Sequence, residues 1–389
     1  MKVGFILGPQ GKKWDDTYYD KFQVTDDRKW LHNVHPKYLM TEKGDDWKSN
    51  SKQDAYVRID VAIAHALIYF FPKYTFDLID VHKVSTKRLR SNDMVINQFM
   101  DLLIVPFVKK FESKGIPHLK LREIYERNKD IIYPPVKYAN LVYDKCAYYS
   151  FLQKRNIPVA PTLCMSRQES YKNLPKASRR IALYALNHKW TKVFAKPVHG
   201  TDSGGVALLA KDFRISKKSL DLLTEEIMKY CKETFKDKRY PSVIFQKYLK
   251  DFEKTVPQAR MYYVENQYKY TILNFHNGNI YKPTQDKHET TEKKKRFQQL
   301  PALKRTADRV LKSITPLFKG YPKLITRIDF GCCLNKTRKP NSFFVNEIEF
   351  NPGLYLHTNG QKRYDLDYAV VETLGKVMRR FEKKRIAFS

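Results

Sequence analysis

The first 140 residues alternate short apolar runs with stretches whose apolar positions recur at helical spacing. Continuous apolar runs bounded by turn residues predict buried strands, and a 3.6-residue repeat predicts amphipathic helices. The predicted strands are residues 2–7, 75–81 and 101–108, and the predicted helices are residues 54–71 and 91–100. This alternation indicates a small parallel sheet in an α/β domain. The polar and aromatic residues 15–53 are expected to form a long loop or insertion.

The rest of the chain mixes further strands with helices. A helix with Asp144 and Lys145 in its first half is expected to end near Arg155. The predicted strands that follow are residues 192–198, 205–210 and 242–249, with a helix over residues 216–235. From there to about Phe350 the pattern is β-rich, and residues 366–385 predict a helix with a basic end. No repeat at solenoid or propeller spacing is present.

Two apolar runs, "TRIDFGCCL" and "SFFVNEIEF", flank the turn-forming residues "NKTRKPN". This arrangement predicts an antiparallel hairpin. A hairpin that folds about the middle of this turn pairs Asp329 with Glu347 and Arg327 with Glu349. Because side chains alternate between the two faces of a strand, these four residues share one face. The opposite face is apolar except for Asn346.

Three carboxylates on one face repel one another unless a cation lies among them. Ligands that are all oxygen favour a hard ion, Mg²⁺ rather than zinc. The neighbouring Arg327 suits an anionic group, such as a phosphoryl group during transfer. The alternative is an ordinary solvent-facing set of salt bridges, and the hairpin taken alone favours that alternative.

A second segment suits polyphosphate. Lys196 ends a predicted strand and precedes the glycine-rich loop "HGTDSGG". Glycines let backbone N–H groups approach phosphate oxygens, and the lysine supplies a point charge. The segment is not a Walker A loop, because no GxxxxGK[ST] precedes a helix. His199 is expected to be a loop residue and not a catalyst. Further on, "FQKYLKDFE" places Glu253 seven residues after Gln246, which by itself is only a strand end with solvated charges.

Composition narrows the class of protein. A chain of 389 residues with 42% hydrophobic content can bury a large core in two or three domains. Lys and Arg number 73 against 41 Asp and Glu, so the net charge of +32 attracts polyanions. No apolar run reaches about 18 residues and no signal-peptide pattern opens the chain, so a cytoplasmic location without a membrane span is expected. The five cysteines include no CxxC pair, so neither a disulfide framework nor a zinc site is expected.

Taken in order, these segments resemble the ATP-grasp superfamily. The motifs are "DKCAYYSFLQKRNIPVAPT", "FAKPVHGTDSGGV", "FQKYL", "QARMYYV" and the pair "RIDF" with "NEIEFNPG". Each is loose alone, but chance is a poor explanation for five in the family's order over residues 134–359. The resemblance implies an ATP-grasp fold with an N-terminal α/β domain at 1–140. Two α+β lobes, at 141–249 and 250–389, would clasp ATP.

The resemblance also implies site residues. Two lysines would contact the phosphates, the glycine-rich loop would cover them, the hinge would hold adenine and an acid would bind ribose. The two lysines are Lys145 and Lys196, and the glycine-rich loop is Gly200, Thr201, Asp202, Ser203, Gly204 and Gly205. The hinge is Gln246, Lys247, Tyr248 and Leu249, and the ribose-binding acid is Glu253. The implied metal ligands are Asp329, Glu347 and Glu349, and the implied catalytic arginines are Arg260 and Arg327. The chain departs from the family pattern at Gln246, where an acid is common, at Gln258, which replaces the usual Asp, and at Glu349, which replaces the usual Asn.

Most members of the superfamily use ATP with two Mg²⁺ ions to phosphorylate a carboxylate, and an amine or thiol then displaces the phosphate. The resemblance therefore implies an ADP-forming carboxylate–amine ligase that works through an acyl-phosphate. The glutathione synthetase, ribosomal-protein glutamate ligase and tubulin tyrosine ligase-like groups are similar. The basic charge would suit an acidic peptide or protein as the acceptor, and residues 293–304 are expected to form a mobile basic loop at its site. The alternative for that segment is a solvated loop without a role.

Two other functions stay open at this stage. One is a kinase of a polyanionic small molecule such as an inositol polyphosphate. The other is a nucleotide- or nucleic-acid-binding module without catalysis. The intact acids argue against an inactive module, and the basic runs lack the spaced aromatic residues of a nucleic-acid stacking platform. The sequence does not name the substrates.

Overall fold

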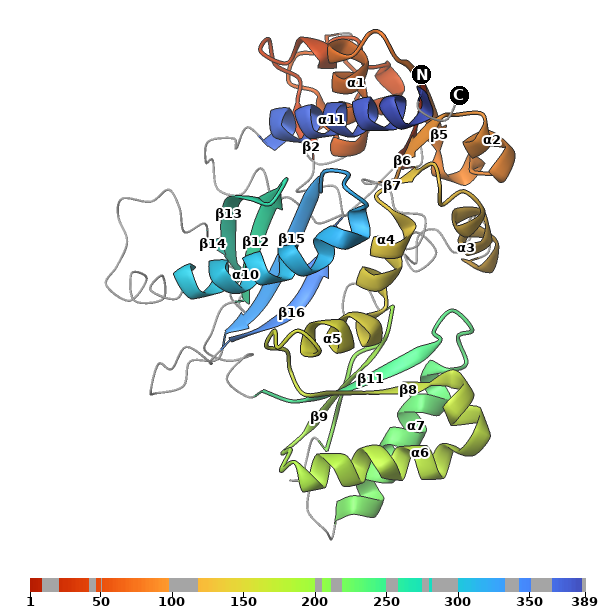
Figure 1. Cartoon of the computed structure of the whole chain (residues 1–389), viewed down its shortest axis with the longest axis vertical. Coiled ribbons are helices and arrows are strands. Elements are labelled where there is room, and N and C mark those ends of the chain that lie inside the picture. Colours follow the sequence, from red (N-terminus) through yellow and green to blue (C-terminus); the bar gives the residue numbers. More distant parts are fainter. Residues whose placement is uncertain are drawn as a thin grey trace.

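The computed structural model describes residues 1–8, 21–41, 47–49, 51–97, 118–199, 205–210, 219–249, 258–274, 280–281, 300–332, 343–350 and 366–386. Figure 1 shows three parts arranged along the long axis of the molecule. The N-terminal residues and the last helix form one end, a sheet of blue and teal strands lies in the middle, and a green sheet with its helices forms the other end.

The N-terminal part contains a four-stranded parallel sheet, in the order β5-β1-β6-β7. Its strands are β1 (Lys2–Leu7), β5 (Thr75–Asp80), β6 (Met94–Ile96) and β7 (Ile132–Tyr133). The associated helices are α1 (Ile59–Phe70), α2 (Thr86–Arg90) and α3 (His118–Arg127). A small antiparallel sheet adds β2 (Lys21–Gln23), β3 (Leu39–Met40) and β4 (Tyr56–Arg58). The predicted parallel sheet with intervening helices is confirmed.

Several predicted elements in this part are wrong. Within the helix predicted over residues 91–100, residues 94–96 form strand β6 instead, and all three are apolar and buried; residues 98–100 lie outside the described part. Residues 54–71 divide between strand β4 and helix α1, because Arg58 has an extended backbone and the helix begins only at Ile59. The loop or insertion expected over residues 15–53 is not a loop throughout, because its described residues include strands β2 and β3. The strand predicted over residues 101–108 lies outside the described residues.

The part at the opposite end is an antiparallel sheet in the order β10-β9-β11-β8. Its strands are β8 (Thr162–Ser166), β9 (Val193–Pro197), β10 (Ala207–Leu209) and β11 (Ser242–Lys247). Helices α6 (Arg167–Asn187) and α7 (Leu220–Thr234) pack together against this sheet (Figure 1). Helix α6 is not among the predicted elements, since Pro175 and a kink at Asn173 interrupt its pattern.

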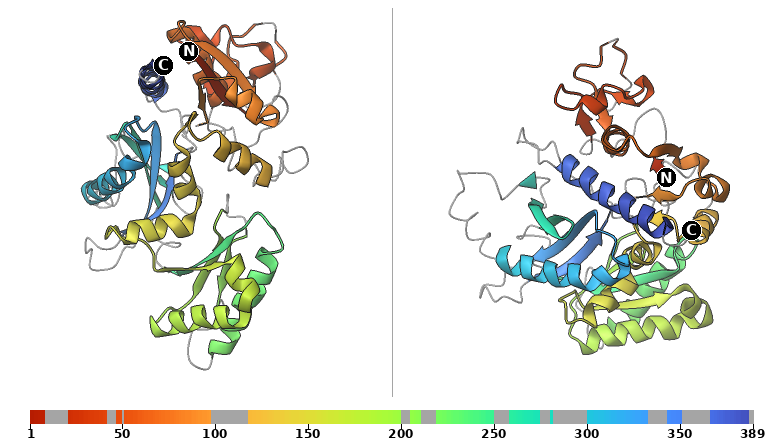
Figure 2. Two further views of the ribbon diagram at one scale, coloured as in Figure 1. Left: turned by 45° about the vertical axis from the view of Figure 1, so that its right-hand side comes forward. Right: turned by 45° about the horizontal axis from the view of Figure 1, so that its top comes forward.

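The central sheet has the order β14-β13-β12-β15-β16. Its strands are β12 (Gln258–Val264), β13 (Gln267–Asn274), β14 (Ile280–Tyr281), β15 (Ile325–Cys332) and β16 (Phe343–Glu349). Helix α10 (Leu300–Ile314) lies on one side of this sheet, and α4 (Val136–Tyr143) and α5 (Lys145–Gln153) lie on the other (Figure 2). The expected basic loop over residues 293–304 is wrong from Leu300 onward, where α10 begins; residues 293–299 lie outside the described part.

The last helix, α11 (Leu366–Ile386), returns to the N-terminal part and packs against α1 (Figure 1). Four short 3-10 helices complete the elements described: η2 (Lys29–Leu31), η3 (Pro36–Tyr38), η4 (Val81–Lys83) and η8 (Thr315–Phe318). One large hydrophobic core joins the N-terminal part to the central sheet, and a second lies within the α6–α7 part. The mixed α and β class is confirmed, and the division at residues 140 and 249 stays a prediction. Among the described helices, none is long and apolar enough to cross a bilayer.

A disulfide is present, although the cysteine spacing gave no reason to expect a disulfide framework. Cys146 in α5 forms a disulfide with Cys164 in β8, and the two Cα atoms are 6.1 Å apart. The sequence pattern could not reveal this pair, because the two cysteines meet only when α5 packs on the β8–β11 sheet. The disulfide therefore ties the helix that begins at Lys145 to an edge strand of that sheet.

Candidate active site

The hairpin of β15 and β16 has the predicted register at its acidic end. Arg327 pairs with Glu349, and Asp329 pairs with Glu347. The four side chains therefore share one face of the central sheet, and Ile328 and Ile348 pair on the buried face. The sheet thus gathers charges that stand far apart in the sequence.

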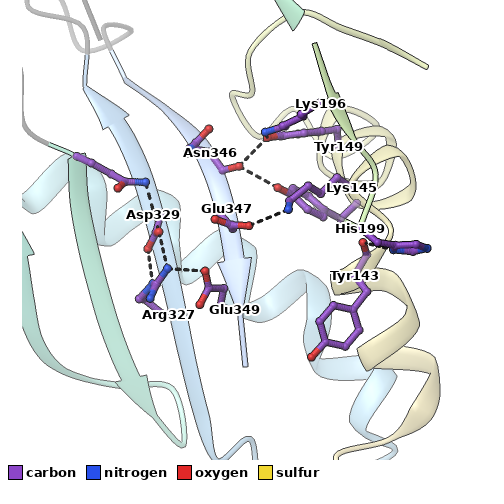
Figure 3. Close-up of polar contacts among 12 residues, drawn as sticks. Tyr143, Lys145, Tyr149, Lys196, His199, Arg327, Asp329, Asn346, Glu347 and Glu349 are labelled. Carbon is purple, nitrogen blue, oxygen red and sulfur yellow. Dashed lines mark hydrogen bonds and ion pairs between the residues drawn. The ribbon is translucent and has the colours of Figure 1, made fainter. Parts of the chain in front are cut away.

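Beyond Asp329 the predicted register is wrong by one residue. Phe330 pairs with Val345, so Asn346 is the extra residue of a β-bulge. The freed backbone carbonyl of Asn346 accepts hydrogen bonds from the hydroxyls of Tyr148 (2.8 Å) and Tyr149 (2.6 Å) in α5. The bulge therefore accounts for the one polar residue that broke the apolar face, and it anchors α5 against β16 (Figure 3).

The three carboxylates form one cluster. One oxygen from each of Asp329, Glu347 and Glu349 lies within 4.8 Å of the other two. Arg327 holds two of these acids: its guanidinium donates to both oxygens of Asp329, at 2.8 and 2.9 Å, and to Glu349 at 2.5 Å. On the neighbouring strand β12, the Nε atom of Arg260 lies 3.8 Å from Asp329.

The acids of the cluster have unequal proton affinities. Burial raises the pKa of Asp329 above its usual range despite the nearby arginines. Burial, with repulsion from Glu347, raises the pKa of Glu349 to about 8. Burial would also raise the pKa of Glu347, but Lys145 and Lys196 outweigh it and lower that pKa. Burial is the largest cause of both raised pKa values, and Arg327 and Arg260 oppose it.

Two lysines face the cluster from elements outside the central sheet (Figure 3). Lys145, the first residue of α5, places its Nζ atom 3.2 Å from Oε1 of Glu347. Asp144 caps this helix by accepting a hydrogen bond from the backbone N–H of Ala147 at 2.9 Å. This cap fixes the start of the helix at Lys145. Lys196, in β9, donates to the hydroxyl of Tyr149 at 3.4 Å. Acids and lysines from separate elements thus converge on one space.

The cluster fits a hard divalent cation. All three candidate ligands are carboxylates, and oxygen donors are the set that Mg²⁺ prefers over zinc. Their oxygens lie close enough together to act as ligands of one ion. Asp329, Glu347 and Glu349 would hold such an ion, which would neutralise charge on a bound polyphosphate.

The predicted hinge also lies beside this space. A cleft at the end of β11 is lined by Ala160, Phe194, Gln246, Lys247, Tyr248, Leu249, Phe344 and Asn346. All four predicted hinge residues, 246–249, are among these. The side chain of Gln246 is buried and donates through Nε2 to Oγ1 of Thr162 at 2.9 Å.

Part of the predicted nucleotide-binding set lies outside the described residues. Gly200, Thr201, Asp202, Ser203, Gly204 and Glu253 lie outside the described part of the chain. Gly205 is described, and its φ of +72° is a left-handed conformation that favours glycine. His199 is half-buried in a loop, its Nδ1 atom lies 3.0 Å from the carbonyl of Tyr143, and its ring points away from the acids (Figure 3).

Sequence reasoning missed residues that organise the site. Tyr148, Tyr149 and Thr162 are not among the predicted set, and they act by hydrogen bonds across elements. Gln258, noted only as a departure from the family pattern, donates to Asp329 at 3.3 Å and accepts from Arg260 at 3.2 Å. The signals in the sequence for these contacts were the break at Asn346 and the departures from the family pattern at Gln246 and Gln258.

The comparisons with known proteins identify the fold. No protein-family model and no curated protein matches the sequence. The structure is similar to a D-cycloserine synthetase, with 16% identity over 80% of this chain and 97% of that chain and a TM-score of 0.52. It is also similar to the D-alanine–D-alanine ligase from Coxiella burnetii, with 10% identity over 100% of this chain and 98% of that chain and a TM-score of 0.51. The chain therefore has the ATP-grasp fold.

Proposed function

We propose that the protein is an ATP-dependent, ADP-forming ligase that joins a substrate carboxylate to an amine. The observation that carries this proposal is the meeting of Asp329, Glu347 and Glu349 with Lys145 and Lys196 from outside the central sheet. Acids that suit Mg²⁺ and cations that suit phosphate, facing one another, are what phosphoryl transfer requires. The similarity to two solved ligases supports the proposal through the fold.

Each side chain has a separate task in this proposal. Lys145 and Lys196 hold phosphate oxygens as point charges. Arg260 contacts the transferring phosphoryl group, because its side chain is more exposed than that of Arg327. Arg327 is engaged with Asp329 and Glu349, so it orders the metal ligands. Bound Mg²⁺ would offset the charge that develops on the phosphoryl oxygens.

The proposed chemistry has two steps. A substrate carboxylate oxygen bonds to the γ-phosphorus while the bond to the β-phosphate oxygen breaks, which releases ADP and leaves an acyl-phosphate. An amine then attacks the activated carbonyl, the carbon–oxygen bond to phosphate breaks, and the amine loses its proton as the amide forms. The second step needs mainly the positioning of the amine near the carbonyl.

The test is an ADP-release assay with mixtures of amino acids and acidic peptides, followed by mass analysis of the product. We expect a condensed product without phosphate, and we expect added hydroxylamine to trap the acyl-phosphate as a hydroxamate. Asp329→Asn should abolish ADP release, whereas Glu233→Gln, which changes an exposed acid in α7, should not. A product that keeps the phosphate and resists hydroxylamine would replace the ligase with a kinase.

A further inference from the structure

The cleft at the end of β11 is lined mainly by apolar and aromatic side chains. Three of its lining side chains are aromatic, Phe194, Tyr248 and Phe344, and two more are apolar, Ala160 and Leu249. In the proposed function this cleft holds the base of the nucleotide, and the inference below rests on that assignment. The question is how a cleft lined largely by apolar side chains would distinguish one purine from another.

Of the polar residues that line the cleft, Gln246 is the one that is buried, and a glutamine is ambiguous as a hydrogen-bonding group. The amide of Gln246 carries an acceptor oxygen and a donor nitrogen that can exchange places by a rotation of about 180°. The sequences that this chain resembles commonly have an acid here. A carboxylate accepts through either oxygen and needs no orientation, but Gln246 selects a base only if something fixes its amide.

Thr162 supplies that orientation. It lies directly opposite Gln246 in the β8–β11 pairing, so the two side chains are neighbours by register. The hydroxyl of Thr162 donates to the carbonyl of Ala160 at 2.7 Å. Because a hydroxyl has a single proton, Thr162 can then only accept from Gln246, and Nε2 is the atom that lies 2.9 Å away.

The chain of donors runs in one direction, from Gln246 through Thr162 to a backbone carbonyl. With Nε2 committed to Thr162, the amide presents Oε1 as its remaining acceptor. Among the described residues no donor to Oε1 is found. We propose that Thr162 is a positioning residue that locks Gln246 as an acceptor and thereby makes the cleft select adenine over 6-oxopurines.

The selection follows from the edge of the base. Adenine carries an amino donor at position 6, and guanine carries an acceptor oxygen there. An acceptor on the protein therefore forms a hydrogen bond with the amino group of adenine. It forms none with the oxygen of guanine, because neither atom carries a proton to donate. A site that leaves a buried polar group unpaired rejects the wrong ligand strongly. We expect the wild-type protein to bind ATP at least about tenfold more tightly than inosine triphosphate, which carries the 6-oxygen without guanine's extra amine.

The experiment measures dissociation constants for ATP and inosine triphosphate by calorimetry, without any acceptor substrate. Thr162→Val keeps the size of the side chain and removes the hydroxyl, so the amide can rotate. We expect the ratio of the two constants to fall at least about fivefold, mainly because inosine triphosphate binds more tightly. Thr162→Ser keeps the hydroxyl and should keep the ratio.

Gln246→Glu separates positioning from mere packing. A carboxylate accepts in either orientation, so the double variant Thr162→Val with Gln246→Glu should regain the wild-type preference for ATP. If Thr162 were only structural, Thr162→Val would weaken both nucleotides alike and the glutamate would rescue nothing. An unchanged ratio in Thr162→Val, or a double variant that behaves like Thr162→Val, would overturn the proposal.

The readout also separates this inference from the proposed ligase activity. If ATP binds selectively but no condensation product forms with any acceptor, the selection by Thr162 stands and the ligase fails. If the wild-type protein binds neither nucleotide, both are overturned. If it binds both with equal affinity, the ligase survives and the selection by Gln246 is wrong.

Discussion

The ion pair between Lys145 and Glu347 leads to opposite expectations for nucleotide binding and for turnover. Without Mg²⁺, Glu347 forms an ion pair with Lys145, the lysine that the proposed function assigns to phosphate. Glu347→Gln removes the negative charge and keeps the shape of the side chain. We therefore expect this variant to bind ATP more tightly than the wild type when a chelator is present, and to form no ADP when Mg²⁺ is present.

The size of the first effect follows from the geometry. Two unit charges 3.2 Å apart attract by about 5 kcal/mol at an effective dielectric constant of about 20. The side chains of Lys145 and Glu347 are 13% and 29% exposed, so desolvation and screening oppose most of this attraction. A net contribution of about 1–2 kcal/mol remains for such a charged contact, which is about a 5- to 30-fold gain in ATP affinity.

Calorimetry with ATP and a chelator measures the gain, and an ADP assay with Mg²⁺ measures the loss. Glu349→Gln is the matched control, because that acid contacts Arg327 instead of Lys145 and should give a smaller gain. In the background of Lys145→Met the gain from Glu347→Gln should shrink, since the two residues are coupled. Weaker or unchanged binding of metal-free ATP by Glu347→Gln would refute the assignment of Lys145 to phosphate.

Other predictions concern single side chains. Lys196→Ala should lose about 1.5–3 kcal/mol of ATP binding in calorimetry, with the fold intact by circular dichroism. Burial lowers the pKa of Lys323 to about 8 from 10.5, so the charged lysine costs the folded state about 3 kcal/mol below pH 8. In chemical denaturation, Lys323→Met should therefore be more stable at pH 7 and lose this advantage as the pH rises from about 8 to 10.5, whereas the exposed Lys312→Met should not change. Cys146→Ser should destabilise the oxidised protein by about 3 kcal/mol, because the disulfide spans 18 residues, and should match the wild type under reductant.

The acidic hairpin could be predicted from the sequence because its register follows from alternation alone. Turn residues between two apolar runs located the hairpin, and the apolar face fixed which residues pair. The prediction failed beyond Asp329, where the bulge at Asn346 shifts the pairing by one residue. A bulge is stabilised by partners outside the hairpin, here the hydroxyls of Tyr148 and Tyr149, and nothing in the local pattern reveals those partners.

The wrong elements of the N-terminal part have a different cause. Strand β6 has only three apolar residues, which is too short for a helical or a strand period to be distinguished. It forms a strand because it pairs with β1 on one side and with β7 on the other. Burial on both faces of a parallel sheet removes the alternation that would identify the strand in the sequence.

The residues that orient the site are harder to find than those that would touch the nucleotide. Lysines, glycines and acids indicate phosphate and metal chemistry by their residue type alone. Thr162 gives no such signal, because its effect depends on lying opposite Gln246 across two strands that are some eighty residues apart in the sequence. A glutamine where an acid is common was the visible departure, and its consequence depends on whether a neighbour fixes the amide. The role of Gln246 can therefore be inferred only together with Thr162, and the pairing of β8 with β11 is what places the two side by side.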